Sequence, residues 1–402
     1  MKIVFYSIIL NNHQANVADE LWELTGHQYC FVELALLGGD NKKGDTRDYA
    51  ECPYLLRAWE SRENWQRAME LAVTAECCVF SGVESLPFQK ARMKQRLLSF
   101  DMSERWLKQG LKNLLSPTIS KMWLAYWLGG WGKKPMYKLC CSAFAASDYR
   151  RLGMYGGKCY KWGYFTKVDG LGERGENLKN QSSKNETSIH NQNIQTPIMW
   201  CARFLDWKHP ELSILLAERL KQSGYSFQLD MYGEGEFRER AESMIDSLRL
   251  RDCISFVGNK PNTELMADMC EHEIFLFTSD KNEGWGAVAN ESMTNGCVLV
   301  ASDAIGSIPY LVQDGVNGFA FRAPSTVSNM DHPDMEALDV LYEKVVWLLN
   351  HKEERQHMRQ NAMRIMQEVW SPSKAAAALL QLINDLQNGM DISIKEGPCS
   401  KA

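Results

Sequence analysis

Short apolar runs alternate with amphipathic stretches along most of the chain. In the first half the apolar runs are Ile3 to Leu10, Phe31 to Leu37 and Cys77 to Phe80. Uninterrupted runs of this length are typical of strands that are buried on both faces of a parallel sheet. After the first run, Val17 and Leu21 recur at helical spacing. The first half is therefore predicted to be α/β.

The same alternation is more regular in the second half. Predicted strands lie at residues 198–203, 226–232, 254–257, 274–278 and 298–302, and predicted helices at 210–223, 264–270 and 287–295. A long helical pair follows over residues 335–386, interrupted by Pro372. Regular strand–helix alternation predicts a second doubly wound domain. Open parallel sheets bind ligands at the carboxyl ends of their strands, so we expect the site in a cleft between the two domains.

A change of composition separates the two halves. Three glycines are followed by Asn, Gln, Ser and Lys with few apolar residues, which predicts a linker. The predicted organisation is an N-terminal Rossmann-like domain, a linker, a C-terminal nucleotide-sugar-binding domain, a helix that returns to the N-terminal domain, and a flexible tail. Their bounds are 1–165, 166–196, 197–368, 369–388 and 389–402.

Composition and charge exclude several classes of protein. The 402 residues carry 45 basic and 50 acidic side chains, a net charge of −5, which argues against a general nucleic-acid binder. The 12 cysteines form no Cys-x-x-Cys pattern, and we interpret them as free thiols in a reducing cytoplasm. The first apolar run ends at polar residues without a cleavage pattern, so we interpret it as a buried strand rather than a signal peptide. No apolar stretch is long enough to predict a spanning helix.

The strongest chemical signal is a glycine-rich loop that leaves a predicted strand and opens a helix. It contains Glu283, Gly284, Trp285 and Gly286, with Glu291 one to two turns further on. Glycines let the backbone approach a ligand closely, and free amides at a helix start favour an anion. The two carboxylates are placed to bind hydroxyl groups of a sugar. The alternative is that Glu283 only caps the helix and Glu291 lies on a solvated face.

Two further segments point to the same kind of ligand. Arg203 ends the first strand of the second half, and Lys208 follows five residues later. A guanidinium and an ammonium group at the carboxyl end of a strand suit a diphosphate. The next strand ends at Gly233 and Gly235, where a nucleotide would need backbone freedom. We therefore predict a nucleoside-diphosphate site.

Over residues 198–321 the chain resembles the retaining glycosyltransferases of GT-B architecture, specifically family four, also called glycosyl transferases group 1. The family's Glu-x7-Glu motif matches Glu283 and Glu291. The resemblance implies that the first contacts the donor sugar and the second holds the nucleotide ribose. It also implies that Arg203 and Lys208 neutralise the pyrophosphate of the donor.

The resemblance further implies a fold, a reaction and its partners. The fold is GT-B, two Rossmann-like doubly wound domains facing across a cleft. The reaction moves a hexose, with retention, from a nucleotide-diphosphate sugar to a glycan or lipid-linked glycan in cell-surface polysaccharide synthesis. The sequence contains no Asp-x-Asp, so we expect neither a metal nor another cofactor. Catalytic roles fall on Glu283, Arg203 and Lys208, and substrate binding on Glu291 and the site glycines and tryptophan, namely Gly233, Gly235, Gly284, Trp285 and Gly286.

The chain departs from the family pattern at two places. Tyr310 stands where the family commonly has an acid, and residues 11–14 replace the family's glycine pair in the first loop. The second change suggests that His13 or Gln14 faces the cleft. We include His13 among the predicted substrate-binding residues.

A segment of the first half combines lysines with aromatic residues. Residues 105–138 contain no acidic side chain but six lysines and four tryptophans. Such a composition is typical of a peripheral contact with an anionic membrane surface, here the inner face of the cell membrane. The alternative is an ordinary core helix with solvated lysines.

Other functions remain open on the sequence alone. A nucleotide-sugar epimerase of the same architecture and a non-catalytic nucleotide-sugar binding protein are the alternatives to a transferase. A dinucleotide-dependent dehydrogenase is disfavoured because no Gly-x-Gly-x-x-Gly follows the first strand. Zinc hydrolysis is disfavoured because the run Cys270-Glu271-His272-Glu273 lacks the spacing of metal ligands on one helix face.

Overall fold

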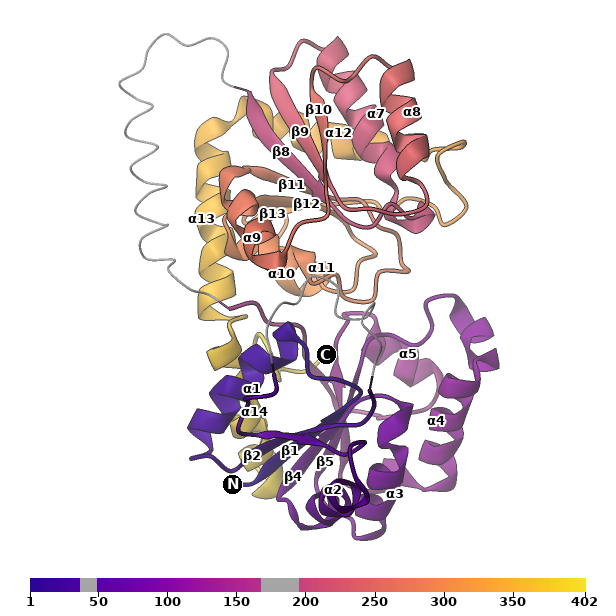
Figure 1. The fold of residues 1–402 in the computed structure, drawn as a ribbon, viewed down its shortest axis with the longest axis vertical. Coiled ribbons are helices and arrows are strands. Elements are labelled where there is room, and N and C mark those ends of the chain that lie inside the picture. Colours follow the sequence, from indigo (N-terminus) through magenta and orange to yellow (C-terminus); the bar gives the residue numbers. More distant parts are fainter. Residues whose placement is uncertain (37–48, 168–194) are drawn as a thin grey trace. The chain divides into compact units, whose positions relative to one another are not determined.

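The computed structural model describes residues 1–36, 49–167 and 195–402 of the chain. Its contacts divide the chain into two compact units. Unit 1 consists of Met1–Lys167 and Val369–Ala402, and unit 2 of Val168–Glu368 (Figure 1). The predicted linker, 166–196, falls almost entirely outside the described residues.

Unit 1 is built on a seven-stranded parallel sheet of order β3-β2-β1-β4-β5-β6-β7. Its strands are β1 (Ile3–Ser7), β2 (Tyr29–Glu33), β3 (Leu55–Arg57), β4 (Cys77–Phe80), β5 (Ser99–Ser103), β6 (Met136–Cys140) and β7 (Cys159–Lys161). All residues of β1 and β4 are buried, as their uninterrupted apolar sequences predict. The first predicted strand, Ile3 to Leu10, ends at Ser7, and the Asn11 side chain then caps a helix by accepting a hydrogen bond from the Gln14 amide (3.1 Å).

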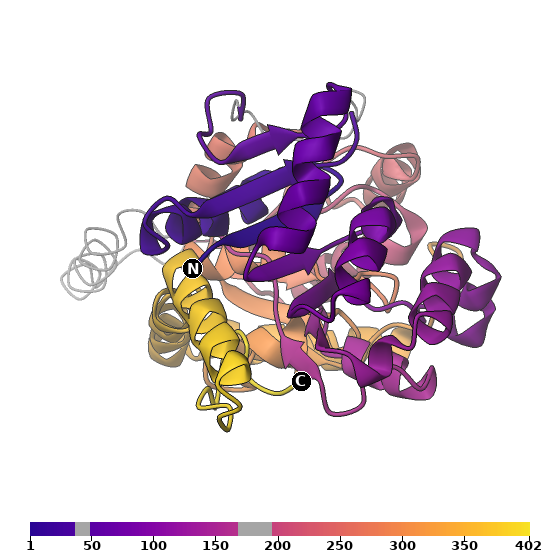
Figure 2. The same ribbon diagram turned by 90° about the horizontal axis from the view of Figure 1, so that it is seen from below.

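Helices cover both faces of this sheet. They are α1 (Asn12–Leu24), α2 (Arg62–Thr74), α3 (Leu86–Lys94), α4 (Pro117–Leu128), α5 (Ala145–Arg151) and α14 (Pro372–Gln387), with the 3-10 helices η2 (Val83–Ser85), η3 (Gly110–Leu115) and η4 (Trp131–Lys133). α1 packs against α14 on one face, and α2 packs against α3 on the other (Figure 2). Right-handed crossovers between parallel strands produce this two-sided arrangement.

The C-terminal segment differs from the flexible tail that we predicted for residues 389–402. Cys399 is fully buried in unit 1. The Cys399 amide donates to the Lys161 carbonyl (2.7 Å), and the Lys161 amide donates to the Ser400 carbonyl (2.8 Å). Lys401 forms an antiparallel bridge with Tyr160. The end of the chain is therefore packed along β7 rather than free, since β7 is an edge strand with unpaired backbone groups.

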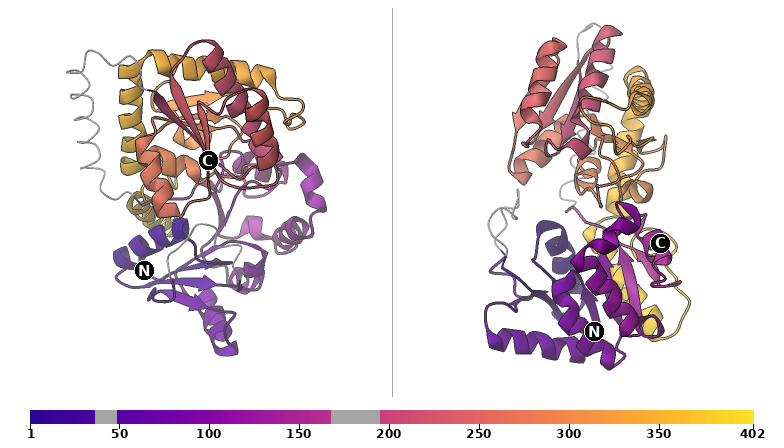
Figure 3. Two further views of the ribbon diagram at one scale, coloured as in Figure 1. Left: turned by 45° about the horizontal axis from the view of Figure 1, so that its top comes forward. Right: turned by 90° about the vertical axis from the view of Figure 1, so that its right-hand side faces the viewer.

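Unit 2 contains a six-stranded parallel sheet of order β10-β9-β8-β11-β12-β13. Its strands are β8 (Thr196–Cys201), β9 (Phe227–Tyr232), β10 (Ile254–Gly258), β11 (Ile274–Phe277), β12 (Val298–Ser302) and β13 (Gly318–Phe321). Its helices are α7 (Pro210–Gln222), α8 (Arg238–Ser247), α9 (Asn262–Glu271), α10 (Val288–Thr294), α11 (Ile308–Leu311), α12 (Met335–Asn350) and α13 (Lys352–Glu368), with the 3-10 helix η5 (Asp206–Lys208). α7 contacts α8 and α12, while α10 contacts α9 and α13, so helices lie on both sides of the sheet (Figures 1 and 3).

The strand order of unit 2 determines where a ligand can bind. β8 is central, with β9 on one side and β11 on the other. The chain therefore leaves β8 in one direction and later returns on the other side, which makes the carboxyl end of β8 a topological switch point. The segments after β8, β9 and β11 all leave this edge of the sheet. They carry the predicted site residues.

No helix in the described part of the chain is both long enough and apolar enough to cross a bilayer.

Candidate functional site

Lys208 and Glu283 meet at the carboxyl edge of the unit 2 sheet. The Lys208 ammonium forms an ion pair with the Glu283 carboxylate, and the two side chains are only 11% and 13% exposed. Ser279 Oγ also donates to Glu283 (3.3 Å), and the Lys208 ammonium lies 4.3 Å from the centre of the Trp207 ring. Thr278 Oγ1 donates to the Lys208 carbonyl (2.7 Å), which fixes the backbone beneath the ammonium. A cation 75 residues from its partner in sequence is thus held in place at this edge.

The glycine turn after β9 is pressed against the segment that carries Arg203. A Cβ atom at Gly233 would lie 2.0 Å from the Ala202 carbonyl oxygen, and one at Gly235 would lie 2.5 Å from the Phe204 carbonyl oxygen. Both glycines also have positive φ angles, 120° and 156°. The Arg203 side chain beside this turn is exposed, and it forms no ion pair with any residue that the structure describes. Its guanidinium is therefore available to a ligand.

Glu291 lies on α10 and is buried. Asn262 Nδ2 donates to Glu291 Oε1 (3.1 Å), and the residue is only 7% exposed. This burial excludes the solvated face that was the alternative interpretation. The pKa of the Cys201 thiol is raised to about 12, mainly by burial and also by the Glu291 charge, while the Lys208 charge lowers it. Both charges therefore act on the same thiol at the end of β8.

Trp285 has a different position from the one we predicted for a substrate-binding residue. Its side chain has no exposed surface, and its Nε1 donates to Asn290 Oδ1 (2.8 Å). Gly286 has a φ angle of 83°, and a Cβ atom there would lie 2.5 Å from the Phe277 ring. Gly284 is buried as well. The buried indole therefore holds the loop to the core. Gly286 lets the loop backbone pack against the Phe277 ring, because it has no side chain.

The stretch around Tyr310 supports the same loop. The Gly306 amide donates to the Glu283 carbonyl (3.4 Å), and the Ser307 amide donates to the Trp285 carbonyl (3.2 Å). The Tyr310 ring lies 6.2 Å from the Trp285 ring, centre to centre. Where the family commonly has an acid, this chain has an aromatic side chain that packs on the buried indole.

A buried charge cluster beside the site escaped the sequence analysis. We call His209, Glu211 and Asp280 the His209 cluster. His209 Nδ1 lies 2.7 Å from Glu211 Oε1, and its Nε2 lies 3.9 Å from Asp280 Oδ2. All three side chains are at most 2% exposed. Burial alone would lower the pKa of His209, but hydrogen bonding and charge attraction from Asp280 and Glu211 outweigh it and raise the pKa to about 9. The imidazole is therefore protonated at neutral pH.

The His209 cluster connects the two segments that carry the ion pair. His209 follows Lys208 directly, and Asp280 begins the turn that leads to Glu283, whose amide donates to the Asp280 carbonyl (3.1 Å). The Asp280 carboxylate also accepts the Asn282 amide (2.8 Å). The sequence signal was weak, because His209 and Asp280 lie far apart in the chain and only folding brings them together.

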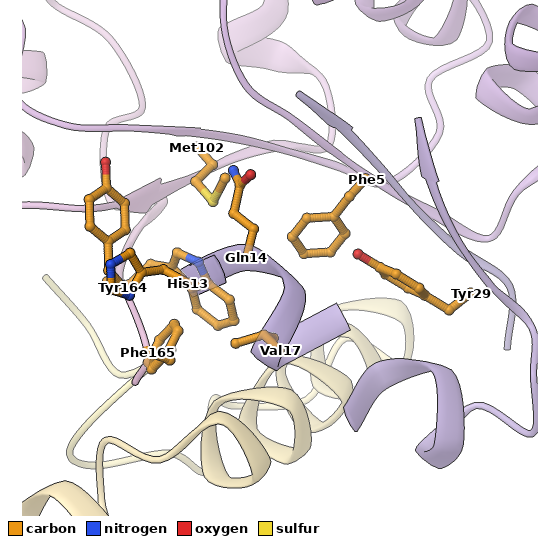
Figure 4. Close-up of a pocket in the computed structure, with 10 residues that line it drawn as sticks. Phe5, His13, Gln14, Val17, Tyr29, Met102, Tyr164 and Phe165 are labelled. Atoms are coloured by element: carbon orange, nitrogen blue, oxygen red, sulfur yellow. The ribbon is translucent and has the colours of Figure 1, made fainter. Parts of the chain in front are cut away.

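His13 lies in unit 1, whereas the other predicted site residues lie in unit 2. It lines a small pocket of about 20 Å³ at the start of α1 (Figure 4). The rings of His13 and Tyr164 stack with centres 5.7 Å apart, and Tyr164 donates to Glu104 Oε1 (2.9 Å). Gln14 Nε2 donates to Ser7 Oγ (3.2 Å), while its Oε1 is buried without a hydrogen-bond partner among the described residues. The pocket is lined by Phe5, His13, Gln14, Val17, Tyr29, Met102, Trp162, Gly163, Tyr164 and Phe165.

The pocket walls are mostly aromatic, with a few polar atoms between them. The enclosed space has room for about one water molecule and not for a sugar ring. Among the residues that the structure describes, no group of three His, Cys, Asp or Glu side chains is arranged to hold a metal ion.

Comparison with known proteins identifies the type of unit 2. Residues 183–364 match the family model described as glycosyl transferases group 1. The amylovoran biosynthesis glycosyltransferase AmsK of Erwinia amylovora is 31% identical over 127 residues, which are 30% of this chain and 31% of that protein. The putative colanic acid biosynthesis glycosyltransferase WcaL of Salmonella typhimurium is 29% identical over 123 residues, which are 29% of this chain and 30% of that protein. The match therefore spans less than a third of the length of these relatives.

Solved structures resemble the whole chain in fold. A crystal structure of Anabaena Alr3699/HepE in complex with UDP aligns with a TM-score of 0.66 at 13% identity, covering 97% of this chain and 100% of that one. The lipopolysaccharide outer core galactosyltransferase WaaB, in its apo form, aligns with a TM-score of 0.63 at 13% identity, covering 97% of this chain and 99% of that one. The fold class is thus GT-B, with two Rossmann-like α/β units in one chain.

Proposed function

Because residues 183–364 make this chain a member of the glycosyl transferases group 1 family, we propose that it transfers a hexose from a nucleotide-diphosphate sugar to a glycan or lipid-linked glycan. The names of its relatives, which concern amylovoran and colanic acid, support a role in cell-surface polysaccharide synthesis. The complex of Alr3699/HepE with UDP-glucose supports a nucleotide sugar as donor. The observation that carries the proposal is the Lys208–Glu283 pair beside the glycine turn at the switch point of unit 2.

In this proposal, Lys208 and Arg203 neutralise the charge that grows on the departing nucleoside diphosphate. An ammonium already fixed by Glu283 needs little reorganisation when the bond to phosphate breaks. Arg203 adds a guanidinium that can bind two phosphate oxygens at once. The absence of side chains at Gly233 and Gly235 allows the diphosphate to approach the backbone. We propose that this charge pattern acts without a metal or other cofactor.

The two carboxylates would hold the rest of the donor. Glu283 is placed to accept hydrogen bonds from hydroxyl groups of the sugar, and Glu291 from those of the ribose. For retention, the acceptor oxygen attacks the anomeric carbon on the face that the phosphate leaves. The bond from the anomeric carbon to the phosphate oxygen breaks, and that phosphate oxygen takes the proton of the acceptor. This route needs no protein nucleophile.

The acceptor would bind unit 1. The surface around His13 offers aromatic rings for the apolar face of a sugar. A cytoplasmic location is also part of the proposal, because all twelve cysteines of the chain are free thiols, which a reducing compartment preserves.

The test is a transfer assay with a panel of nucleotide sugars that detects released nucleoside diphosphate. Lys208→Ala and Glu283→Ala should each lower turnover by at least about 100-fold, the usual loss when a preorganised electrostatic contact is removed. The matched control is Lys221→Ala, which removes a lysine of the same unit whose ion pair with Asp252 lies on the exposed surface. Its turnover should stay near that of the parent.

Two outcomes would contradict the proposal. Full turnover of Lys208→Ala or Glu283→Ala would show that the donor binds elsewhere. Binding of the nucleotide sugar without release of nucleoside diphosphate from any donor and acceptor pair would instead indicate a binding protein. Circular dichroism and thermal melting of each variant should match the parent, so that lost turnover reports chemistry and not unfolding.

A further inference from the structure

Unit 1 exposes apolar side chains in one short stretch of the chain. Thirteen large apolar residues are exposed among those that the structure describes, and five of them fall between residues 111 and 128. These are Leu111 (64% exposed), Leu115 (86%), Leu124 (47%), Trp127 (51%) and Leu128 (86%). We call these five side chains the apolar patch. Water-exposed leucines in such density mark a binding surface.

The apolar patch lies on η3 and α4, which pack against each other. Along α4, Pro117, Lys121, Leu124 and Leu128 are all exposed, and their spacing places them on one helix face. The opposite face, with Met122, Ala125 and Tyr126, packs into unit 1. α4 lies on the outside of unit 1, on the other side of this unit from α1 and α14 (Figures 1 and 2). The exposed face is therefore presented outward.

Positive charge surrounds the apolar patch without negative charge to balance it. No acidic residue occurs between Arg105 and Lys138. Three lysines of this stretch are exposed, Lys112 on η3, Lys121 on α4 and Lys133 on η4. Within the described parts of the chain, none of the three lies within salt-bridge distance of an acidic group. In contrast, Arg105, Lys108 and Lys138 of the same stretch each have an acidic partner.

We propose that η3, α4 and η4 form a docking surface for an anionic lipid bilayer. The leucines and Trp127 enter the interfacial region, and Lys112, Lys121 and Lys133 meet the lipid phosphates. Leucine and tryptophan next to lysine are the residues that interfacial helices use. Since no described helix could span a bilayer, this contact is peripheral.

The composition of the surface favours a bilayer over a protein partner. Lysine is depleted in protein–protein interfaces, where arginine, methionine and aromatic residues are enriched, and leucine seldom dominates their binding energy. A symmetric contact between two copies of the chain would bring the unpaired lysines of both patches together. Their like charges would repel each other. An anionic bilayer offers phosphates to the exposed lysines and an apolar interior to the leucines and Trp127.

The test is co-sedimentation of the full chain with vesicles of phosphatidylethanolamine and phosphatidylglycerol. The parent should bind these vesicles, bind pure phosphatidylcholine weakly, and lose affinity as salt rises. Lys112→Gln with Lys121→Gln should lower the partition coefficient about 25-fold, which corresponds to about fivefold per lysine. Leu124→Ser with Leu128→Ser should lower it by about tenfold or more.

Two double variants serve as matched controls. Lys90→Gln with Lys94→Gln removes two exposed lysines of α3 in the same unit, and Val327→Ser with Met335→Ser removes two exposed apolar side chains of unit 2. Both should bind as the parent does. All variants change exposed side chains, so the melting temperature should stay unchanged.

Several results would overturn the inference. These are absent binding to anionic vesicles, equal binding to phosphatidylcholine, equal losses in the controls, or a dimer that only the patch variants disrupt. Failure here is separable from failure of the proposed transfer reaction. The patch variants should still release nucleoside diphosphate from the donor in solution, whereas Lys208→Ala should lose that release and keep vesicle binding.

Discussion

The buried charge of His209 gives unit 2 a pH dependence that can be calculated. The pKa of the imidazole is raised from its ordinary value of 6.5 to about 9 in the folded state. Below pH 6.5 the folded and unfolded states are both protonated, so the stabilisation is fully present. Between 6.5 and 9 folding takes up a proton, and stability falls as the pH rises. Above 9 the contribution is lost.

The size of this effect follows from the shift. Each pKa unit corresponds to 1.36 kcal/mol, so the cluster contributes about 3 kcal/mol at the acidic end of the window. We expect His209→Asn to remove it. Asparagine is chosen because His209 has a φ angle of 49°, a left-handed conformation that asparagine tolerates better than most residues. The substitution then removes the charge without adding backbone strain.

The assay is amide hydrogen exchange by mass spectrometry on parent and variant at the same pH. Peptides from β8 and α7 report on unit 2, and peptides from unit 1 are the internal control. The ratio of exchange rates between variant and parent in unit 2 should fall by roughly a few hundredfold from pH 6 to pH 10. A ratio that does not change with pH would refute the reasoning. So would an imidazole resonance, missing in the variant, that titrates at or below its ordinary value.

Two other substitutions test the site. Gly233→Ala should destabilise unit 2 by about 2 kcal/mol or more in urea unfolding, because the new Cβ would meet the Ala202 carbonyl, whereas Gly224→Ala adds only the strain of a positive φ in open space. Equal losses in the two variants would show that the close approach is relieved by small movements. His13→Ala should raise the KM for the acceptor and leave the Kd of the donor nucleotide unchanged. A change confined to the donor would place the acceptor elsewhere.

Local pattern was sufficient to predict the two parallel sheets. The apolar runs at β1, β4 and β11 are buried on both faces, and such strands carry their signal in a few consecutive residues. The carboxyl ends of neighbouring parallel strands share one edge, so Lys208 and Glu283, which both follow predicted strands, were expected at one donor site. The structure places these two side chains in contact.

Side-chain direction and long-range pairing were beyond the reach of the sequence. Trp285 sits among site residues in the chain, yet its indole points into the core, because the loop turns at Gly286. The His209 cluster joins two loops whose separation in sequence hides their contact. The C-terminal residues look like a polar tail, but an unpaired strand edge in unit 1 binds them.

The amino-acid sequence by itself determined the α/β class of both halves, the site loop at Glu283 and the cationic, apolar composition of residues 105–138. These properties depend on residues close together in the chain. Only the tertiary structure decided which of those side chains are exposed, which charges are paired and where the C-terminal residues pack. Those properties depend on contacts between distant segments, and packing, not local preference, sets them.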